Sequence, residues 1–140
     1  MTERQMSDMV KHQNPLMLRP SDTVRHACQA MRERRVGAVV VTDANQRLAG
    51  IFTGRDAVYR VLAGAKDASK TVLEEVMTRN PDTVPPRTTA IEALRLMRDG
   101  GYRHLPIIEK DKVVGVVSRG DFRGIEQDRL DEETGLWERI

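Results

Sequence analysis

Two short stretches of this sequence carry a hydroxyl and a carboxylate three residues apart. Thr53 precedes Asp56 in the first stretch, and Ser118 precedes Asp121 in the second. Both stretches begin with glycine and two apolar residues, which places the pair where a strand turns into a helix. The carboxylate of such a pair can accept from two hydroxyls, such as a ribose diol. The hydroxyl and the N–H groups of a helix N-terminus suit a phosphate.

A helix cap is the alternative interpretation of each stretch. Serine, threonine and aspartate are common at helix N-termini, where the side chain accepts a hydrogen bond from a backbone N–H. For one stretch alone the cap would be the better interpretation. Two copies within a longer repeat shift the balance toward a ligand.

Both stretches lie at matching positions of an internal repeat. Residues 14–15 (Asn-Pro) recur at 80–81, and Thr23 recurs as Thr89, an offset of 66 residues. The offset falls to 65 after a polar segment near Lys110, where a hairpin turn tolerates a change of length. We expect a first repeat at 9–64, a linker at 65–75, a second repeat at 76–128 and a tail at 129–140.

Each repeat predicts the element order strand, helix, strand, strand, helix. Thr23 and Thr89 precede apolar residues at helical spacing, and Thr89 with Glu92 resembles a capping box. Continuous apolar runs at 38–41 and 105–108 predict buried strands, each followed by a second strand, at 48–53 and 113–118. Further expectations are helix ends at Gly37 and at 100–101, a short helical entry to the second repeat at 72–76, and loosely held residues 1–8.

Composition limits the class of protein. The 140 residues include 23 basic and 21 acidic ones, well interspersed, so no basic arm indicates nucleic acid. No apolar run approaches the ~20 residues that span a membrane, and the first residues lack signal-peptide features. Cys28, the only cysteine, falls on an apolar helix stripe and is expected in the core. These features favour a cytoplasmic protein.

The repeated pattern resembles the cystathionine-β-synthase (CBS) domain, and the tandem resembles a CBS pair, or Bateman module. The likeness covers about residues 9–128 and includes both Asn-Pro pairs, both helix starts, residues 102–107 (Tyr-Arg-His-Leu-Pro-Ile) and both stretches that end in Asp. It implies an α+β fold, with two βαββα repeats packed by pseudo-twofold symmetry through their sheets. No catalytic domain is attached, so a stand-alone CBS-pair protein is expected.

The resemblance also implies adenine nucleotides, AMP, ADP, ATP, NAD or S-adenosylmethionine, in two clefts between the repeats. In one cleft Asp121 would hold a ribose, Ser118 a phosphate, Arg103 and His104 the phosphates, and the base would contact Lys11, Leu16, Val36, Gly37 and Ala38. In the other, Asp56 and Thr53 take these roles, and the base side comprises Met77, Asp82, Tyr102, Arg103 and His104. Arg55 either adds a positive charge there or is a solvated surface arginine. The first cleft is expected to bind better because Arg103 offers a rigid fork of donors and His104 a further one.

A regulatory sensor of nucleotides, with AMP or ATP ahead of NAD and S-adenosylmethionine, is therefore the expected function. Catalysis is not expected, because His12, His26 and His104 are scattered, without metal-ligand spacing or a nucleophile nearby. The alternative is a structural or partner-binding module without a nucleotide. We expect a homodimer formed through the helices at 56–64 and 121–130, and we expect a protein target. The tail, with Leu136 and Trp137, is expected to pack on the module.

Overall fold

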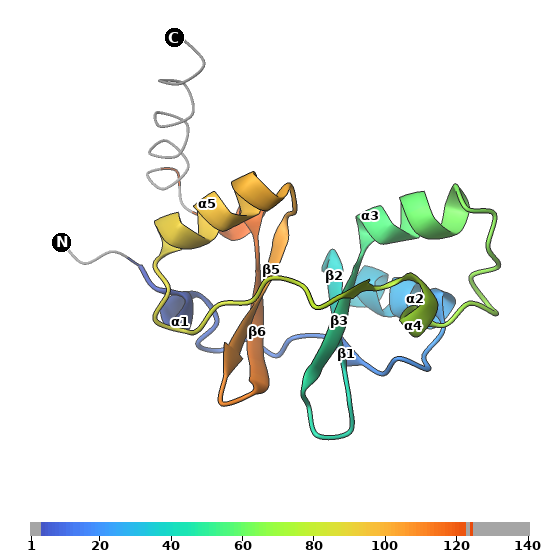
Figure 1. Cartoon of the computed structure of the whole chain (residues 1–140), viewed down its shortest axis with the longest axis horizontal. Helices are drawn as coiled ribbons and strands as arrows, with labels where there is room; N and C mark the ends of the chain where they lie inside the picture. The colour runs from blue at the N-terminus through green and yellow to red at the C-terminus, as the bar shows by residue number, and fades with distance from the viewer. Residues whose placement is uncertain (1–3, 123, 125–140) are drawn as a thin grey trace, which may run out of the picture. The chain divides into compact units, whose positions relative to one another are not determined.

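The chain forms two units, as seen in a computed structural model that describes residues 4–122 and 124 (Figure 1). The first-repeat unit comprises 14–81 and 110–113. Of the described residues, the second-repeat unit comprises 4–13, 82–109, 114–122 and 124. Each unit combines strands with helices, which confirms the predicted α+β class with two repeats.

A four-stranded sheet in the order β1-β2-β3-β4 forms the centre of the first-repeat unit. Its strands are β1 (Met17–Leu18), β2 (Ala38–Thr42), β3 (Leu48–Thr53) and β4 (Thr78–Arg79). The central pair β2 and β3 is antiparallel, with Ala38 opposite Thr53. Strand β1 runs parallel to β2, and β4 antiparallel to β3. Every residue of β2 is buried, as its continuous apolar run predicted.

Helices complete the core of this unit. They are α2 (Val24–Arg34), α3 (Gly54–Asp56), the π-helical segment η1 (Ala57–Leu62) and α4 (Leu73–Val76). Thr23 caps α2 by accepting from the backbone N–H of His26 at 3.1 Å. The core is built from apolar side chains of α2, β2, β3, η1 and α4, among them Val24, Ala27, Met31, Val39, Val41, Phe52, Val61, Leu73 and Val76. Cys28 packs against this cluster, half-buried, as its position on the helix stripe predicted.

The second-repeat unit has the order helix, strand, strand and 3-10 turn around a smaller, two-stranded sheet. Its elements are α1 (Met6–Met9), α5 (Ala90–Gly100), β5 (His104–Glu109), the 3-10 turn η2 (Arg119–Asp121) and, from its third residue onward, β6 (Lys112–Ser118). Strands β5 and β6 are neighbours, and a parallel bridge joins Val84 to Ile107. The predicted capping box of Thr89 and Glu92 is confirmed, with bonds of 3.2 and 3.3 Å.

Helix ends match between the repeats, with one difference from the prediction. Gly101 ends α5 in the left-handed region at φ +71°, as expected for glycine. At the matching end of α2 stands Arg35, at φ +54°. The prediction of Gly37 as this helix end was therefore wrong. The backbone N–H of the next residue, Val36, donates to Met31 at 3.0 Å, so the chain has already turned toward β2 before it reaches Gly37.

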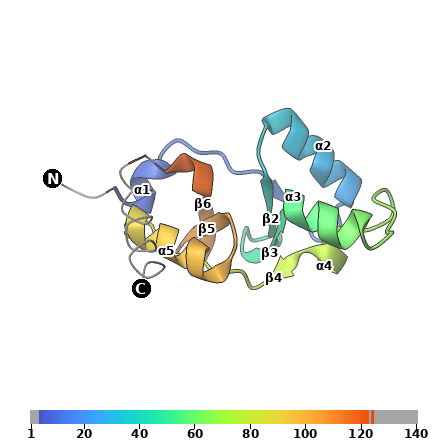
Figure 2. The same cartoon turned by 90° about the horizontal axis from the view of Figure 1, so that it is seen from above.

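The N-terminal segment belongs to the core of the second-repeat unit, and the prediction that it is loosely held was wrong for the described residues 4–8. The side chain of Met6 is fully buried. Its backbone N–H donates to the carbonyl of Thr88 at 2.8 Å, and Ala90 donates to the carbonyl of Arg4 at 2.8 Å. Figures 1 and 2 both place α1 beside β6, and a Cβ on Gly115 of that strand would meet Val10 at 2.5 Å.

Helix α4 occupies the equivalent place in the first-repeat unit. The backbone N–H of Leu73 donates to the carbonyl of Asp22 at 2.9 Å, and that of Val24 donates to Thr71 at 2.9 Å. The helical segment at 72–76 was predicted correctly as a helix. It packs, however, with the repeat that precedes it in the chain. Each unit thus contains a short helix that directly precedes the other repeat along the sequence.

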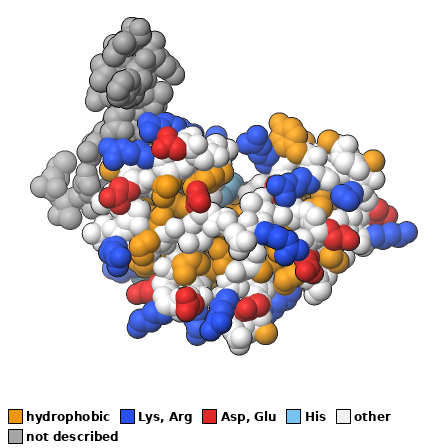
Figure 3. All heavy atoms as spheres, in the orientation of Figure 1, with side chains coloured by type: hydrophobic (Ala, Val, Ile, Leu, Met, Phe, Trp, Pro, Cys, Tyr) orange, Lys and Arg blue, Asp and Glu red, His pale blue; other side chains and the backbone are white. Residues whose placement is uncertain are grey.

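The predicted helix over 121–130 and the tail lie outside the described residues, except for residues 121, 122 and 124. Phe122 is 8% exposed and belongs to the core of the second-repeat unit. On the face shown in Figure 3, acidic and basic side chains are interspersed, in agreement with the net charge of +2.

Candidate functional site

The first hydroxyl and carboxylate pair forms a closed capping box. Thr53 ends β3, and its hydroxyl oxygen accepts from the backbone N–H of Asp56 at 3.3 Å. In return, Asp56 Oδ2 accepts from the backbone N–H of Thr53 at 2.9 Å and from its hydroxyl at 3.2 Å. The cap interpretation is therefore correct for the local structure of this stretch. The hydroxyl of Thr53 and one carboxylate oxygen of Asp56 already bind each other.

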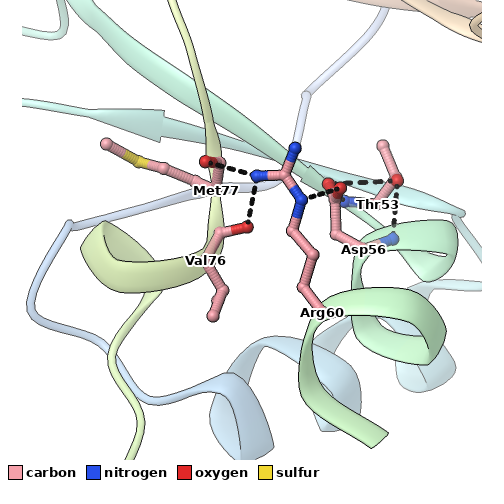
Figure 4. Close-up of polar contacts among 5 residues, drawn as sticks. All are labelled: Thr53, Asp56, Arg60, Val76 and Met77. Carbon is pink, nitrogen blue, oxygen red and sulfur yellow. Dashed lines mark hydrogen bonds and ion pairs between the residues drawn. The ribbon is translucent and has the colours of Figure 1, made fainter. Parts of the chain in front are cut away.

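The other oxygen of Asp56 faces an arginine (Figure 4). Arg60 Nε lies 3.4 Å from Asp56 Oδ1, and the Nη1 group of the same guanidinium donates to the carbonyls of Val76 at 3.1 Å and Met77 at 3.0 Å. The side chain of Asp56 is only 12% exposed. Sequence reasoning missed Arg60, although its position four residues after Asp56 is a local signal for an ion pair on one helix face.

The second pair is more open. The backbone N–H of Ser118 donates to Asp121 Oδ2 at 2.8 Å, as in the first stretch. Within residues 4–122 and 124, Asp121 Oδ1 has no hydrogen-bond partner, and Asp121 is exposed. The position that corresponds to Arg60 is Ile125, which lies outside the described residues and whose side chain carries no donor.

His104 and Arg103 lie beside this second pair. The backbone N–H of Arg119 donates to the carbonyl of Arg103 at 2.9 Å, which ties the start of β5 to the end of β6. The same bond recurs in the first-repeat unit, from Gly54 to Gly37, at 3.1 Å. Burial and the nearby Arg103 lower the pKa of His104, while the carboxylate of Asp121 acts to raise it. His104 is therefore a neutral donor near pH 7, and Arg103, which is exposed, supplies the fixed positive charge.

Two further predicted residues of the second-repeat unit form a pair. The Tyr102 hydroxyl donates to Asp82 Oδ2 at 2.7 Å. Burial and then this carboxylate raise the pKa of Tyr102, so the phenol stays protonated. The structure therefore brings Tyr102 and Asp82 together in one unit, although the sequence separates them by 20 residues.

The first-repeat unit contains several other predicted residues. Ala38 is the strand partner of Thr53, and the carbonyl of Leu16 accepts from Val40 at 2.9 Å. Val36 is 41% exposed, whereas Met77 is buried. The sulfur of Met77 would lie only 2.7 Å from a Cβ added to Gly50.

Two predicted cations stand outside these groups. The guanidinium of Arg55 lies 5.4 Å from the ring centre of Tyr59, so it stacks on its own helix. Lys11 is exposed in the turn after α1, in the second-repeat unit. The base contacts predicted for Asp121 thus come from both units, and their meeting in one site remains a prediction.

One arginine near the second pair was missed. Arg4 Nη2 donates to the backbone carbonyl of Asp121 at 3.5 Å. The two residues are 117 positions apart, so no local pattern could have indicated this contact. It exists because α1 packs in the second-repeat unit.

Two kinds of feature are absent from the part of the chain that the structure describes. That part contains no group of three or more His, Cys, Asp or Glu residues able to hold a metal ion. Its helices include none that is long and apolar enough to cross a membrane.

The structure thus has two α+β repeats, each with a Thr/Ser-x-x-Asp pair at a strand-to-helix turn. The family model described as "CBS domain" matches residues 6–63 and again 73–127. The chain belongs to the CBS domain family, as the resemblance predicted.

Relatives agree with this assignment. The Arabidopsis thaliana CBS domain-containing protein CBSCBSPB2 is 41% identical over 102 residues, which is 73% of this chain and 19% of that protein. The chain thus spans about a fifth of the length of this relative. A solved structure of a putative signal-transduction protein with CBS domains from Burkholderia ambifaria is 30% identical, with a TM-score of 0.78 over 84% of this chain and 89% of that one.

A third similar protein shares the fold at lower identity. The CBS domain protein PAE2072 from Pyrobaculum aerophilum, solved as a complex with AMP, has a TM-score of 0.80 and 24% identity. The likeness covers 91% of this chain and 98% of that chain.

Proposed function

We propose that this chain is a regulatory module that senses adenine nucleotides, and that it binds them rather than transforming them. The observation that carries the proposal is the open pair in the second-repeat unit. Asp121 Oδ1 has no hydrogen-bond partner among the described residues, and the pair lies beside a neutral His104 and a cationic Arg103. A carboxylate for a diol, next to donors for a phosphate, is complementary to a nucleotide.

Each residue would have a separate role. The Asp121 carboxylate would accept from the ribose diol, a charge-assisted pair worth about 1.5–3 kcal/mol. Ser118 would donate to a phosphate. Arg103 would add a fork of donors with a permanent charge. His104, kept neutral by burial, would add one N–H without a second charge. The AMP complex of PAE2072 is consistent with this assignment and prompts AMP as the first ligand to test.

A titration series tests the proposal. AMP, ADP, ATP, NAD, S-adenosylmethionine and adenosine would each be titrated into the purified chain by calorimetry. We expect AMP or ATP to bind best. Arg103→Ala should weaken AMP and ATP strongly and leave adenosine nearly unchanged, because only the phosphate contact is lost. Arg79→Ala is a matched control, since Arg79 is exposed and pairs with Glu74. If no compound in the panel binds at millimolar concentration, the alternative of a partner-binding module without a nucleotide is favoured.

We also propose a homodimer formed with a second copy of the chain. The segment α3–η1 exposes three apolar side chains in the first-repeat unit: Val58 at 52%, Tyr59 at 65% and Leu62 at 74%. Three such neighbours on one helical segment are characteristic of a surface that binds another protein. Sedimentation should show a dimer at micromolar concentration, and Leu62→Asp should shift it toward monomer. A parent chain that sediments as a monomer would contradict the proposal.

A further inference from the structure

The two Asp pairs differ in how many of their polar atoms are already bound. Thr53 uses its hydroxyl as donor and acceptor toward Asp56, and both carboxylate oxygens of Asp56 have a partner. In the other unit, one oxygen of Asp121 has no hydrogen-bond partner among the described residues. The difference at the carboxylate comes from Arg60, because both stretches share the bond from backbone N–H to Oδ2.

We propose that Arg60 decides which of the two Asp pairs can bind a nucleotide. It blocks Asp56, so that the chain binds one nucleotide, at Asp121. This inference rests on the proposed function. A ribose diol donates two hydrogen bonds to a carboxylate, and at Asp56 one of them would have to displace Nε of Arg60, which lies 3.4 Å from Oδ1.

The position of Arg60 is fixed from outside its own helix. Its Nη1 group donates to the carbonyls of Val76 and Met77, at the end of α4 (Figure 4). Such carbonyls at a helix C-terminus favour a cation. Met77 is itself held against β3, where its sulfur and the carbonyl of Thr78 fill the space beside Gly50. Displacing Arg60 would therefore break an ion pair and two hydrogen bonds at once.

Arg60→Met tests this inference, because methionine keeps part of the aliphatic stem and removes every donor. Titration with AMP should give one site per chain for the parent. The Arg60→Met variant should gain a second site, and the double variant Arg60→Met with Asp56→Ala should lose it again. Arg79→Met is the matched control. It removes one arginine that donates to a carbonyl of α4, that of Glu74, without touching Asp56, and it should keep one site.

The outcomes separate the inference from the proposed function. One site in both the parent and the Arg60→Met variant, with equal affinity, would overturn the inference and leave the proposed function standing. Two sites in the parent would also overturn it, and so would weaker binding in Arg60→Met, which would make Arg60 a ligand contact.

If the parent binds nothing, the proposed function fails. Binding that appears only in Arg60→Met and depends on Asp56 would then still support the block, and no binding in either would overturn both. Circular dichroism at the titration temperature confirms that each variant is folded. If Arg60→Met does not fold, Arg60→Gln replaces it.

Discussion

Replacing Met6 with alanine should destabilise the second-repeat unit strongly. The Met6 side chain is fully buried among residues of α5, β5 and β6. Removal of a buried methionine side chain down to Cβ costs about 2–5 kcal/mol, because apolar contacts are lost and a cavity remains. That is a large part of the total stability of a domain, which is about 5–15 kcal/mol.

Urea unfolding followed by circular dichroism measures the loss. With a slope of about 2 kcal/mol per molar urea, a loss of about 3 kcal/mol lowers the midpoint by roughly 1.5 M. Met9→Ala is the matched control on the same helix. Its side chain is only partly buried against the same core and should cost clearly less. A loss below about 1 kcal/mol for Met6→Ala would refute the conclusion that the N-terminal segment is part of this core.

Two further predictions concern stability. Because the pKa of His104 lies below its usual 6.5, the unfolded chain takes up a proton first as the pH falls. The contribution of His104 to the free energy of unfolding is therefore fully present above about pH 6.5 and is lost as the pH falls toward the lower pKa of the folded state. His104→Gln should thus lose less stability than the parent between pH 7.5 and 5.5, and equal losses would contradict this. Gly101→Ala should cost about 1 kcal/mol in urea unfolding, because φ is +71°, whereas Gly54→Ala, with open space around its Cβ, should not; matching midpoints would argue against strain at Gly101.

Elements set by local patterns could be predicted from the sequence. Strand β3 was predicted with its observed bounds, and the helices α2 and α5 begin after Thr23 and Thr89 as expected. A capping residue and a run of apolar residues act over a few positions, so their signals lie within the segment itself. The gap in the repeat also falls, as predicted, in the turns between paired strands.

Features that depend on distant contacts could not be predicted. Met6 stands in a polar stretch, and it is buried only because residues more than 80 positions away surround it. Arg35 occupies a left-handed position that glycine fills in the other repeat, because the turn into β2 is set by the backbone bond to Met31.

The candidate site divides in the same way. The two Asp caps follow from spacing alone, and so could the pair of Arg60 with Asp56, four residues apart. The carbonyls of Val76 and Met77, which hold that arginine in place, lie 16 and 17 positions from it. They come near only because β4 pairs with β3. Sequence spacing therefore located both carboxylates but could not show that one of them is already bound.

The affinity of the Asp121→Ala variant for AMP tests the central claim most directly. If the Asp121 carboxylate accepts the ribose diol, calorimetry should show binding at least about tenfold weaker than in the parent, since 1.4 kcal/mol corresponds to a factor of ten. Asp56→Ala, the matched change in the blocked pair, should bind AMP nearly as well as the parent. If the Asp121→Ala chain binds AMP as tightly as the parent does, the ribose assignment is wrong, and this stretch is a helix cap only.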